Sequence, residues 1–349
     1  MQLPIIDQSE SENIKVRKKI SDMFSEARKE AKPTTCRLCG KKATSFCNSH
    51  SVPQLSLRSI ADSGKVLQAT ALSGMQAVDI EKGVKNSGTF QYICNDCDNS
   101  FFQDYENKQN LINYPTDKML GEIAVKNFLL ELHKREVQKA LLVNMQKQQR
   151  SFENFNQLSE LFSLDERDYN EEIEFHKNIV EQNITGGYQI LLWKVLPYKI
   201  PIAVQSAVAL TLDLEGNMIN DVYDYSRKNR IQFLHIAIFP LENESILLAF
   251  YHKRDKKYRK LRHQFNCISE DKQIEFINYL IFAYTENFFI SKKIQLDIEK
   301  NPKLTSLSKE LYQTPDFGML SLENLYGKDY SPVTMSEIPN FLSKEWAVV

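Results

Sequence analysis

The stretch that decides the fold of the N-terminal part is "CRLCGKKATSFCNSHSVP", Cys36 to Pro53, which contains three cysteines and one histidine. It opens on a C-x-x-C pair, and a second such pair stands at Cys94 and Cys97. A C-x-x-C turn presents two thiolates at the angle that tetrahedral zinc requires, so two turns complete one closed site. A thioredoxin-like redox site needs only one pair. The sequence therefore predicts a structural Zn²⁺ bound by Cys36, Cys39, Cys94 and Cys97.

An alternative ligand set lies entirely within the first stretch and consists of Cys36, Cys39, Cys47 and His50. It would leave the second pair without partners, so we favour the two-pair set. The pairs are separated by 54 residues, whereas a simple zinc ribbon has roughly fifteen to twenty. We therefore expect an inserted segment, and its glycines at 64, 74, 83 and 88 predict short strands and turns. We expect Cys47 and Cys267 to be small buried residues.

The two pairs resemble the treble-clef or ββα-metal fold, and within it the HNH-like nucleases that carry two C-x-x-C pairs. In that family an acidic residue and a histidine follow the first pair, and a proline commonly stands three residues further on. The matching stretch here is Ser49-His50-Ser51-Val52-Pro53. The second pair opens a helix in that family, which matches the stretch from Cys94 to Asp98. The resemblance covers about residues 34–110.

The resemblance implies a phosphodiester hydrolase with His50 as the general base, a role that suits the near-neutral pKa of histidine. It also implies a second divalent cation, Mg²⁺ or Mn²⁺, that neutralises charge on the phosphate. Ser49 stands where the family has an acidic metal ligand, and the family's late histidine or asparagine has no clear match. Asp98, Asn99 and Glu106 are the candidate substitutes, because they lie on or just before the expected helix. Service in bacterial antiviral defence is a further implication of the resemblance.

The segment around the first pair is strongly basic. Residues 13–65 contain 12 Lys and Arg against 4 Asp and Glu, although the whole chain has a net charge of −1. Such a patch suits a phosphate-bearing partner, DNA or RNA. A second basic run, "HKRDKKYRKLRH" at 252–263, includes an aromatic residue that could stack on a base, although a solvated loop has the same composition. The candidate nucleic-acid contacts are Arg37, Lys41, Lys42, Arg58, Lys256, Lys257, Tyr258 and Arg259.

The chain changes character after about residue 186. Runs rich in β-branched and aromatic residues, the run "MINDVYDY" at 218–225 among them, predict four or five antiparallel strands between 188 and 252. The apolar run from Glu270 to Ile290 predicts a helix that covers one face of that sheet. The fold class is therefore α+β. We expect an HNH-like zinc domain with an N-terminal helix at 1–115, connecting helices at 116–185, a sheet-and-helix domain at 186–300 and an irregular tail at 301–349.

Composition narrows the class of protein. With 42% hydrophobic and 26% charged residues the chain is typical of a soluble globular protein. We see no apolar run long enough for a membrane span and no secretory signal, so we expect a cytoplasmic protein. Walker and G-x-G-x-x-G phosphate loops and the G-x-S-x-G hydrolase elbow are absent. Two hypotheses stay open: the endonuclease, and a non-catalytic zinc-structured module that binds nucleic acid or a protein partner. The C-terminal domain could bind that partner or form a homo-oligomer.

Overall fold

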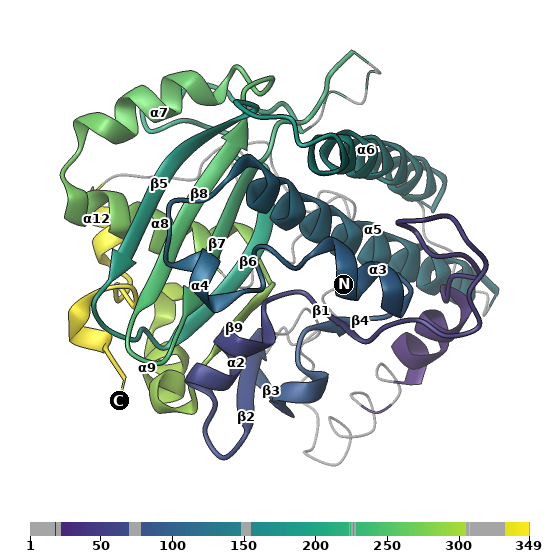
Figure 1. Cartoon of the computed structure of the whole chain (residues 1–349), viewed down its shortest axis with the longest axis horizontal. Coiled ribbons are helices and arrows are strands. Elements are labelled where there is room, and N and C mark those ends of the chain that lie inside the picture. The colour runs from purple at the N-terminus through teal and green to yellow at the C-terminus, as the bar shows by residue number, and fades with distance from the viewer. Residues whose placement is uncertain are drawn as a thin grey trace.

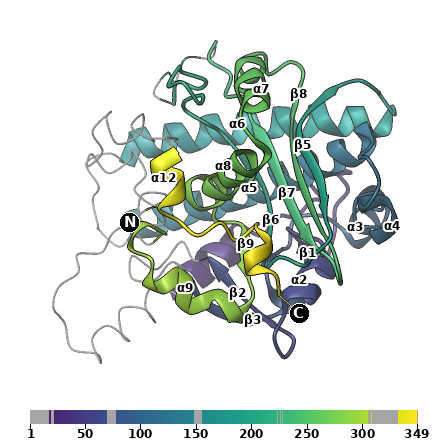
Figure 2. The same cartoon turned by 90° about the vertical axis from the view of Figure 1, so that its left-hand side faces the viewer.

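A seven-stranded antiparallel sheet forms the centre of the molecule, with strand order β3-β2-β9-β6-β7-β8-β5. The computed structural model describes residues 18, 22–69, 78–147, 155–222, 224, 226, 228–304, 307 and 332–348. Helices lie on both faces of the sheet (Figure 1, Figure 2), which confirms the predicted α+β class. The strands are β2 (Lys65–Ala69), β3 (Val78–Gly83), β5 (Tyr188–Leu196), β6 (Ile202–Val208), β7 (Leu234–Pro240), β8 (Ser245–His252) and β9 (Phe288–Ile290).

The two faces of the sheet belong to two different apolar clusters. On β7, Ile236 and Ile238 pack into the cluster that contains the buried face of α8 (Glu270–Tyr284). Ala237 and Phe239 point to the opposite side and pack with α5 (Asp117–Lys147). Because both faces are covered, β7 is buried along its whole length and reads in the sequence as a continuous apolar run.

Long helices cover one face of the sheet and shorter ones the other. α6 (Phe155–Glu181) packs along α5, and α12 (Pro332–Ser336) packs against α8. No helix in the described part of the chain is both long and apolar enough to cross a membrane. The remaining short elements are α4 (Lys108–Leu111), α7 (Tyr258–Cys267), η2 (Lys292–Ile294), α9 (Gln295–Lys300) and η4 (Lys344–Trp346).

The N-terminal cysteine region consists of two short paired strands and a helix. β1 (Ser49–His50) pairs antiparallel with β4 (Thr89–Phe90), and α3 (Asn95–Phe101) follows. The segment between β1 and β4 contains α2 (Gln54–Ile60), β2, β3 and η1 (Val84–Asn86). β2 pairs with β9, Leu67 lying opposite Ile290. The predicted domains 1–115 and 186–300 therefore share one sheet.

The predicted helix from Glu270 to Ile290 is too long. α8 ends at Tyr284, and Thr285 already has an extended backbone. Phe288 to Ile290 then form β9, which fills the position between β2 and β6. A short apolar run that is buried on all sides has no period of its own, so the sequence did not distinguish a strand from a further helical turn.

The predicted strand at 218–225 does not form in its described part, and residues 223 and 225 lie outside the described residues. The side chain of Asn220 makes the hydrogen bonds that a neighbouring strand would otherwise make. Its Nδ2 donates to the carbonyls of Leu210 and Gln232, at 2.8 and 2.9 Å. An asparagine that satisfies backbone groups in this way favours a loop over a strand.

The two ends of the chain are described only in part. The expected N-terminal helix is seen as helix at 22–30, and residues 1–17 and 19–21 lie outside the described part. Of the tail expected to be irregular, residues 305–306, 308–331 and 349 lie outside it. Phe341 and Leu342, which follow α12, are buried in the cluster around α8.

Candidate functional site

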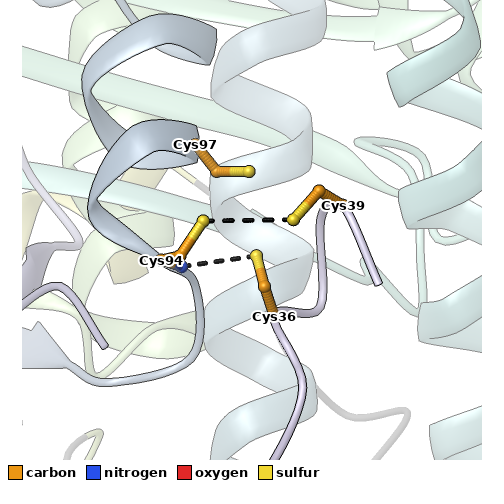
Figure 3. Close-up of side chains that lie close together, drawn as sticks. All are labelled: Cys36, Cys39, Cys94 and Cys97. Carbon is orange, nitrogen blue, oxygen red and sulfur yellow. Dashed lines mark hydrogen bonds between the residues drawn. The ribbon is translucent and has the colours of Figure 1, made fainter. Parts of the chain in front are cut away.

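The four cysteines of the two C-x-x-C pairs come together at the start of α3 (Figure 3). Their sulfur atoms all lie within 4.8 Å of one another, and the Sγ atoms of Cys39 and Cys94 are 3.9 Å apart. A tetrahedral ion with metal–sulfur bonds of about 2.3 Å places its sulfurs about 3.8 Å apart. The four thiols therefore fit a metal ion. Cys47 and His50, the other members of the alternative ligand set, lie outside this cluster.

Backbone N–H groups shape the cysteine cluster and favour the thiolate form of Cys36. Gly40 has a φ of +71° and donates its N–H to the carbonyl of Cys36 at 2.8 Å, which closes the first turn. Cys94 caps α3 and donates its N–H to Sγ of Cys36 at 3.3 Å. Burial alone would raise the pKa of Cys36, but such N–H donors outweigh it and lower that pKa to about 7. Burial and the neighbouring thiols raise the pKa of Cys97, so a cation is what would let all four ionise together.

The strand pair β1–β4 places His50 near the start of α3. Nε2 of His50 lies 3.0 Å from the carbonyl oxygen of Val84. A carbonyl can only accept, so the ring carries its proton on Nε2 and leaves Nδ1 as its acceptor. Burial and the positive charge of Lys126 lower the pKa of His50, against the carbonyl and two nearby carboxylates, which raise it. The imidazole is therefore neutral at pH 7.

A buried lysine on α5 lies between β1 and α3. The side chain of Lys126 is 1% exposed. Its Nζ donates to Ser49 Oγ and to Asp98 Oδ1, each at 2.9 Å, and lies 3.3 Å from Glu106 Oε1. It also lies 3.7 Å from the centre of the Phe102 ring, within cation–π range. We refer to Lys126, Ser49, Asp98 and Glu106 as the Lys126 centre.

Both oxygens of Asp98 accept hydrogen bonds. Oδ1 accepts from Lys126 and also from the hydroxyl of Ser49 at 2.6 Å, and Oδ2 accepts from the thiol of Cys47 at 3.1 Å. Burial alone would raise the pKa of Asp98, but the Lys126 ammonium and the Ser49 hydroxyl outweigh it and hold that pKa below its ordinary value. Asp98 is therefore an ionised carboxylate that binds the ammonium.

A buried glutamate fixes the segment that carries Glu106. Oε2 of Glu122, on α5, accepts the backbone N–H groups of Asp104 and Tyr105, both at 3.1 Å. Burial raises the pKa of Glu122 to about 7, even though these N–H donors act to lower it. The residues just before Glu106 are thereby attached to the same helix as Lys126.

The candidate ligands of a catalytic divalent ion are arranged differently from the prediction. Asp98 and Glu106 do come together, but around the ammonium of Lys126. Asn99 is exposed, and its backbone carbonyl accepts from Gln103. Mg²⁺ needs near-octahedral oxygen ligands, and these oxygens are already bonded to an internal cation. The residues present therefore do not fit a second metal ion.

Sequence reasoning missed Lys126, although the chain contains a signal for it. The lysine stands in the α5 stretch "GEIAVKNFLL", where its neighbours are buried. A lysine inside an apolar helical stretch almost always has a charged partner. The identity of that partner could not be read from the sequence, because Ser49 is 77 positions away.

The candidate nucleic-acid residues form two separate groups. Lys41 and Lys42, which follow the first cysteine pair, and Arg58, on α2, are all exposed, and Arg37 pairs with Glu136. Lys256, Lys257 and Arg259 are exposed beside α7, which lies at the other end of the sheet from α2 (Figure 1, Figure 2). One ligand therefore does not contact both groups unless it is long enough to cross the molecule.

Tyr258 is wrong as a stacking platform for a base. The side chain is fully buried, and its hydroxyl accepts the N–H of Leu210 at 3.2 Å. The reason is that the basic run becomes helical at this residue, so α7 turns Tyr258 inward onto the sheet while the lysines and arginines face solvent.

An open cleft adjoins the Lys126 centre. It has a volume of about 620 Å³ and shares Glu106 with that centre. Its three cations, Arg58, Lys108 and Lys199, outnumber its two acidic residues, Glu106 and Glu242. Lys108 and Glu242 are 3.7 Å apart and both exposed, so solvent screens their attraction. His50 does not line the cleft, whose other lining residues are Pro53, Gln54, Leu55, Ser59 and Leu241.

We compared the chain with protein-family models, with curated proteins and with solved structures. None of them matches. The function is therefore argued from the site alone.

Proposed function

We propose that β1, β4 and α3 form the active site of an HNH-like endonuclease, which hydrolyses phosphodiester bonds with His50 as the general base. The observation that carries the proposal is the bond from Nε2 of His50 to the carbonyl of Val84. It fixes the tautomer in which Nδ1 can accept a proton, which is the requirement for a base. The order strand, strand, helix around the four cysteines agrees with the resemblance.

The proposed step needs one base and one water molecule. Nδ1 of His50 accepts a proton from the water as its oxygen forms a bond to phosphorus. The bond from phosphorus to the leaving sugar oxygen breaks, and that oxygen takes a proton from solvent. The lowered pKa of His50 keeps the ring unprotonated at neutral pH, so the base is in its active form.

We propose Zn²⁺ as the ion for the four cysteines, because four thiolates at this spacing form its usual structural site. Such an ion joins the turn at Cys36 to the start of α3 and takes no part in the reaction. It holds α3, and with it Asp98, at the position where β1 can meet the helix.

The cleft beside Glu106 is the proposed path for the nucleic-acid backbone. Arg58 was predicted as a phosphate contact from the sequence, and the cleft places Lys108 and Lys199 with it. Cations that contact phosphates give an affinity that falls steeply with salt. We expect binding here to be sensitive to ionic strength and largely independent of base sequence.

The second candidate function is a zinc-structured module that binds nucleic acid without cleaving it. The Lys126 centre favours this function, because Asp98 and Glu106 bind an ammonium rather than remaining available to a catalytic metal ion. His50 bonded to backbone would then be a structural residue of the ββα unit.

Cleavage by matched histidine variants tests the proposal. Zinc-loaded protein is incubated with supercoiled plasmid and with single-stranded RNA, in Mg²⁺, in Mn²⁺ and without added divalent ion. His50→Gln preserves an N–H donor for Val84 but has no basic nitrogen, and we expect it to cleave at least about 100-fold more slowly. His263→Gln is the control, since His263 is exposed on α7.

Three results would count against the nuclease. Equal cleavage by His50→Gln and wild type would show that His50 is not the base. Loss of cleavage in His263→Gln would show that the effect is not specific to the site. No cleavage by any protein, with salt-sensitive binding retained, would favour the binding module.

A further inference from the structure

We infer that the ammonium of Lys126 replaces the second metal ion of an HNH-like site, so that the site binds no catalytic divalent cation. The consequence for catalysis rests on the proposed function. The claim that no divalent cation binds rests on the Lys126 centre alone, and a metal-binding measurement tests it without any assay of cleavage.

The ammonium has a complete set of partners. A lysine Nζ carries three N–H donors, and three oxygens surround it, from Ser49 and Asp98 at 2.9 Å and from Glu106 at 3.3 Å. The Phe102 ring adds a fourth contact at 3.7 Å. A buried charge that is paired on every side is the arrangement that offsets its desolvation. Lys126 is therefore fixed in this position and does not move aside easily.

The position of the ammonium is the position where a metal ion would bind. Ser49 stands in the sequence where the resemblance has an acidic ligand, and Asp98 lies on α3 directly opposite, with 2.6 Å between their oxygens. A serine hydroxyl is a weak ligand for Mg²⁺ but a good acceptor for an ammonium. The replacement of an acid by Ser49 is thus explained by the cation that it meets.

A divalent cation added to this site would be repelled by the positive charge of Lys126. Lys126 shares Oδ1 of Asp98 with Ser49, and Cys47 donates to the remaining oxygen of Asp98. Glu106, whose side chain is 37% exposed, is the carboxylate of the centre that is most open to solvent, and the side chain of Asp98 is 17% exposed. One carboxylate beside a buried ammonium does not form the six-oxygen shell of Mg²⁺ or Mn²⁺.

Lys126 acts through other residues, because its side chain is buried and does not reach a substrate. It joins β1 to α3 and adds positive charge close to His50, which helps to keep the imidazole neutral. Lys126 is thus a positioning residue. Without a metal ion at the site, positive charge for the phosphodiester backbone would come from the cleft cations Arg58, Lys108 and Lys199.

Manganese binding to the zinc-loaded full-length protein tests the inference. Electron paramagnetic resonance of free Mn²⁺ is followed during titration of wild type and of Lys126→Met, which retains an unbranched apolar side chain but lacks the terminal ammonium. We expect no Mn²⁺ bound to wild type and one Mn²⁺ per chain bound to Lys126→Met. Lys139→Met is the control, because Lys139 lies on the same helix and pairs with Glu166 at 2.7 Å away from the centre; it should behave as wild type.

Mn²⁺ binding to the wild-type protein tests the inference even if Lys126→Met does not fold. Mn²⁺ that binds to wild type and is lost in Asp98→Asn would overturn the inference. So would a folded Lys126→Met that binds none, because the oxygens would then not be a metal site. The nuclease proposal fails separately, through equal cleavage by His50→Gln. If wild type cleaves, an absolute requirement for Mg²⁺ would also overturn the inference, whereas cleavage without added divalent ion would support it.

Discussion

Gly88 and Phe289 are in such close contact that a Cβ atom on Gly88 would lie 2.3 Å from Cζ of the Phe289 ring. Gly88 immediately precedes β4, and Phe289 is the middle residue of β9, so the contact joins the ββα unit to the large sheet. Nearby, Ser51 donates to Oδ1 of Asn287 at 2.8 Å in a buried position. The position of β1 and His50 therefore depends on the sheet as well as on the cysteines.

Replacement of Gly88 by alanine should destabilise the protein by about 2 to 4 kcal/mol, because a buried clash adds to backbone strain. The φ of Gly88 is +61°. Gly216→Ala is the control, since Gly216 has a φ of +80° but open space around it; strain alone should cost about 1 kcal/mol. Urea unfolding of both variants measures the difference. Equal losses would mean that the contact with Phe289 relaxes freely.

Purified protein should contain about one zinc ion per chain, as one set of four cysteines requires. Cys36→Ser and Cys94→Ser should lose the metal and the ordered N-terminal region together, because the ion is part of the fold there. Cys267→Ser should retain both, since Cys267 is an exposed free cysteine outside the cluster. Elemental analysis gives the metal content, and hydrogen exchange gives the order. Full zinc content in Cys94→Ser would contradict the ligand set.

The cleft cations should contribute to nucleic-acid binding and the cations beside α7 should not. Arg58→Ala and Lys199→Ala should each weaken binding of a fluorescent oligonucleotide and make the dependence of affinity on salt less steep by about one phosphate contact. Lys256→Ala and Arg259→Ala remove exposed charges at the other end of the sheet. Fluorescence anisotropy at several salt concentrations compares the four. If the two cleft variants and the two α7 variants weaken binding equally, the oligonucleotide is attracted by the overall charge of the protein rather than bound in the cleft.

Partly buried histidines should make the fold less stable in weak acid. Burial, with positive charge on His176 and Arg254, lowers the pKa of His252 from 6.5 to about 4. Nδ1 of His252 accepts the N–H of Arg254 at 3.0 Å, a bond that protonation of Nδ1 removes. Between pH 6.5 and 4 the unfolded chain binds a proton that the folded chain does not. The free energy of unfolding therefore falls as pH falls, by about 1.4 kcal/mol per unit for such a group.

A variant comparison isolates the contribution of His252. His252→Asn retains an acceptor for Arg254 but does not titrate, so its unfolding free energy should change less between pH 6.5 and 4. The exposed His263 provides the control variant, His263→Asn. Urea titrations at several pH values measure both. A slope in His252→Asn that is as steep as in wild type would assign the acid sensitivity to other groups, such as His133, whose pKa burial also lowers to about 4.

The parts of the molecule that the sequence predicted are the locally determined ones. Two C-x-x-C turns specify four ligands whatever lies between them, and the sulfurs of Cys36, Cys39, Cys94 and Cys97 do come together. The apolar runs likewise indicated the strands β5 to β8, because a β-branched and aromatic run between turns is a property of a short segment.

The parts that were missed depend on distant partners. Lys126 is explained only by side chains on β1, on α3 and just after α3, and β9 only by the strands on either side of it. The sequence predicted that Tyr258 stacks on a base because it is the aromatic residue of a basic run, whereas the packing of α7 on the sheet determines which residues of that run face inward. Composition gives the charge of a segment, but tertiary contacts decide its orientation.

The pairing of β2 with β9 has a consequence for how the chain can be divided. Leu67 and Ile290 meet across more than 200 residues, so the border of the sheet next to the cysteine region forms only when nearly the whole polypeptide is present. A fragment that stops near residue 115 would leave a hydrophobic strand without its neighbour, which is the condition for self-association. Catalytic or binding activity should therefore be sought in the intact chain, because truncation would remove the neighbour of β2 together with the C-terminal half.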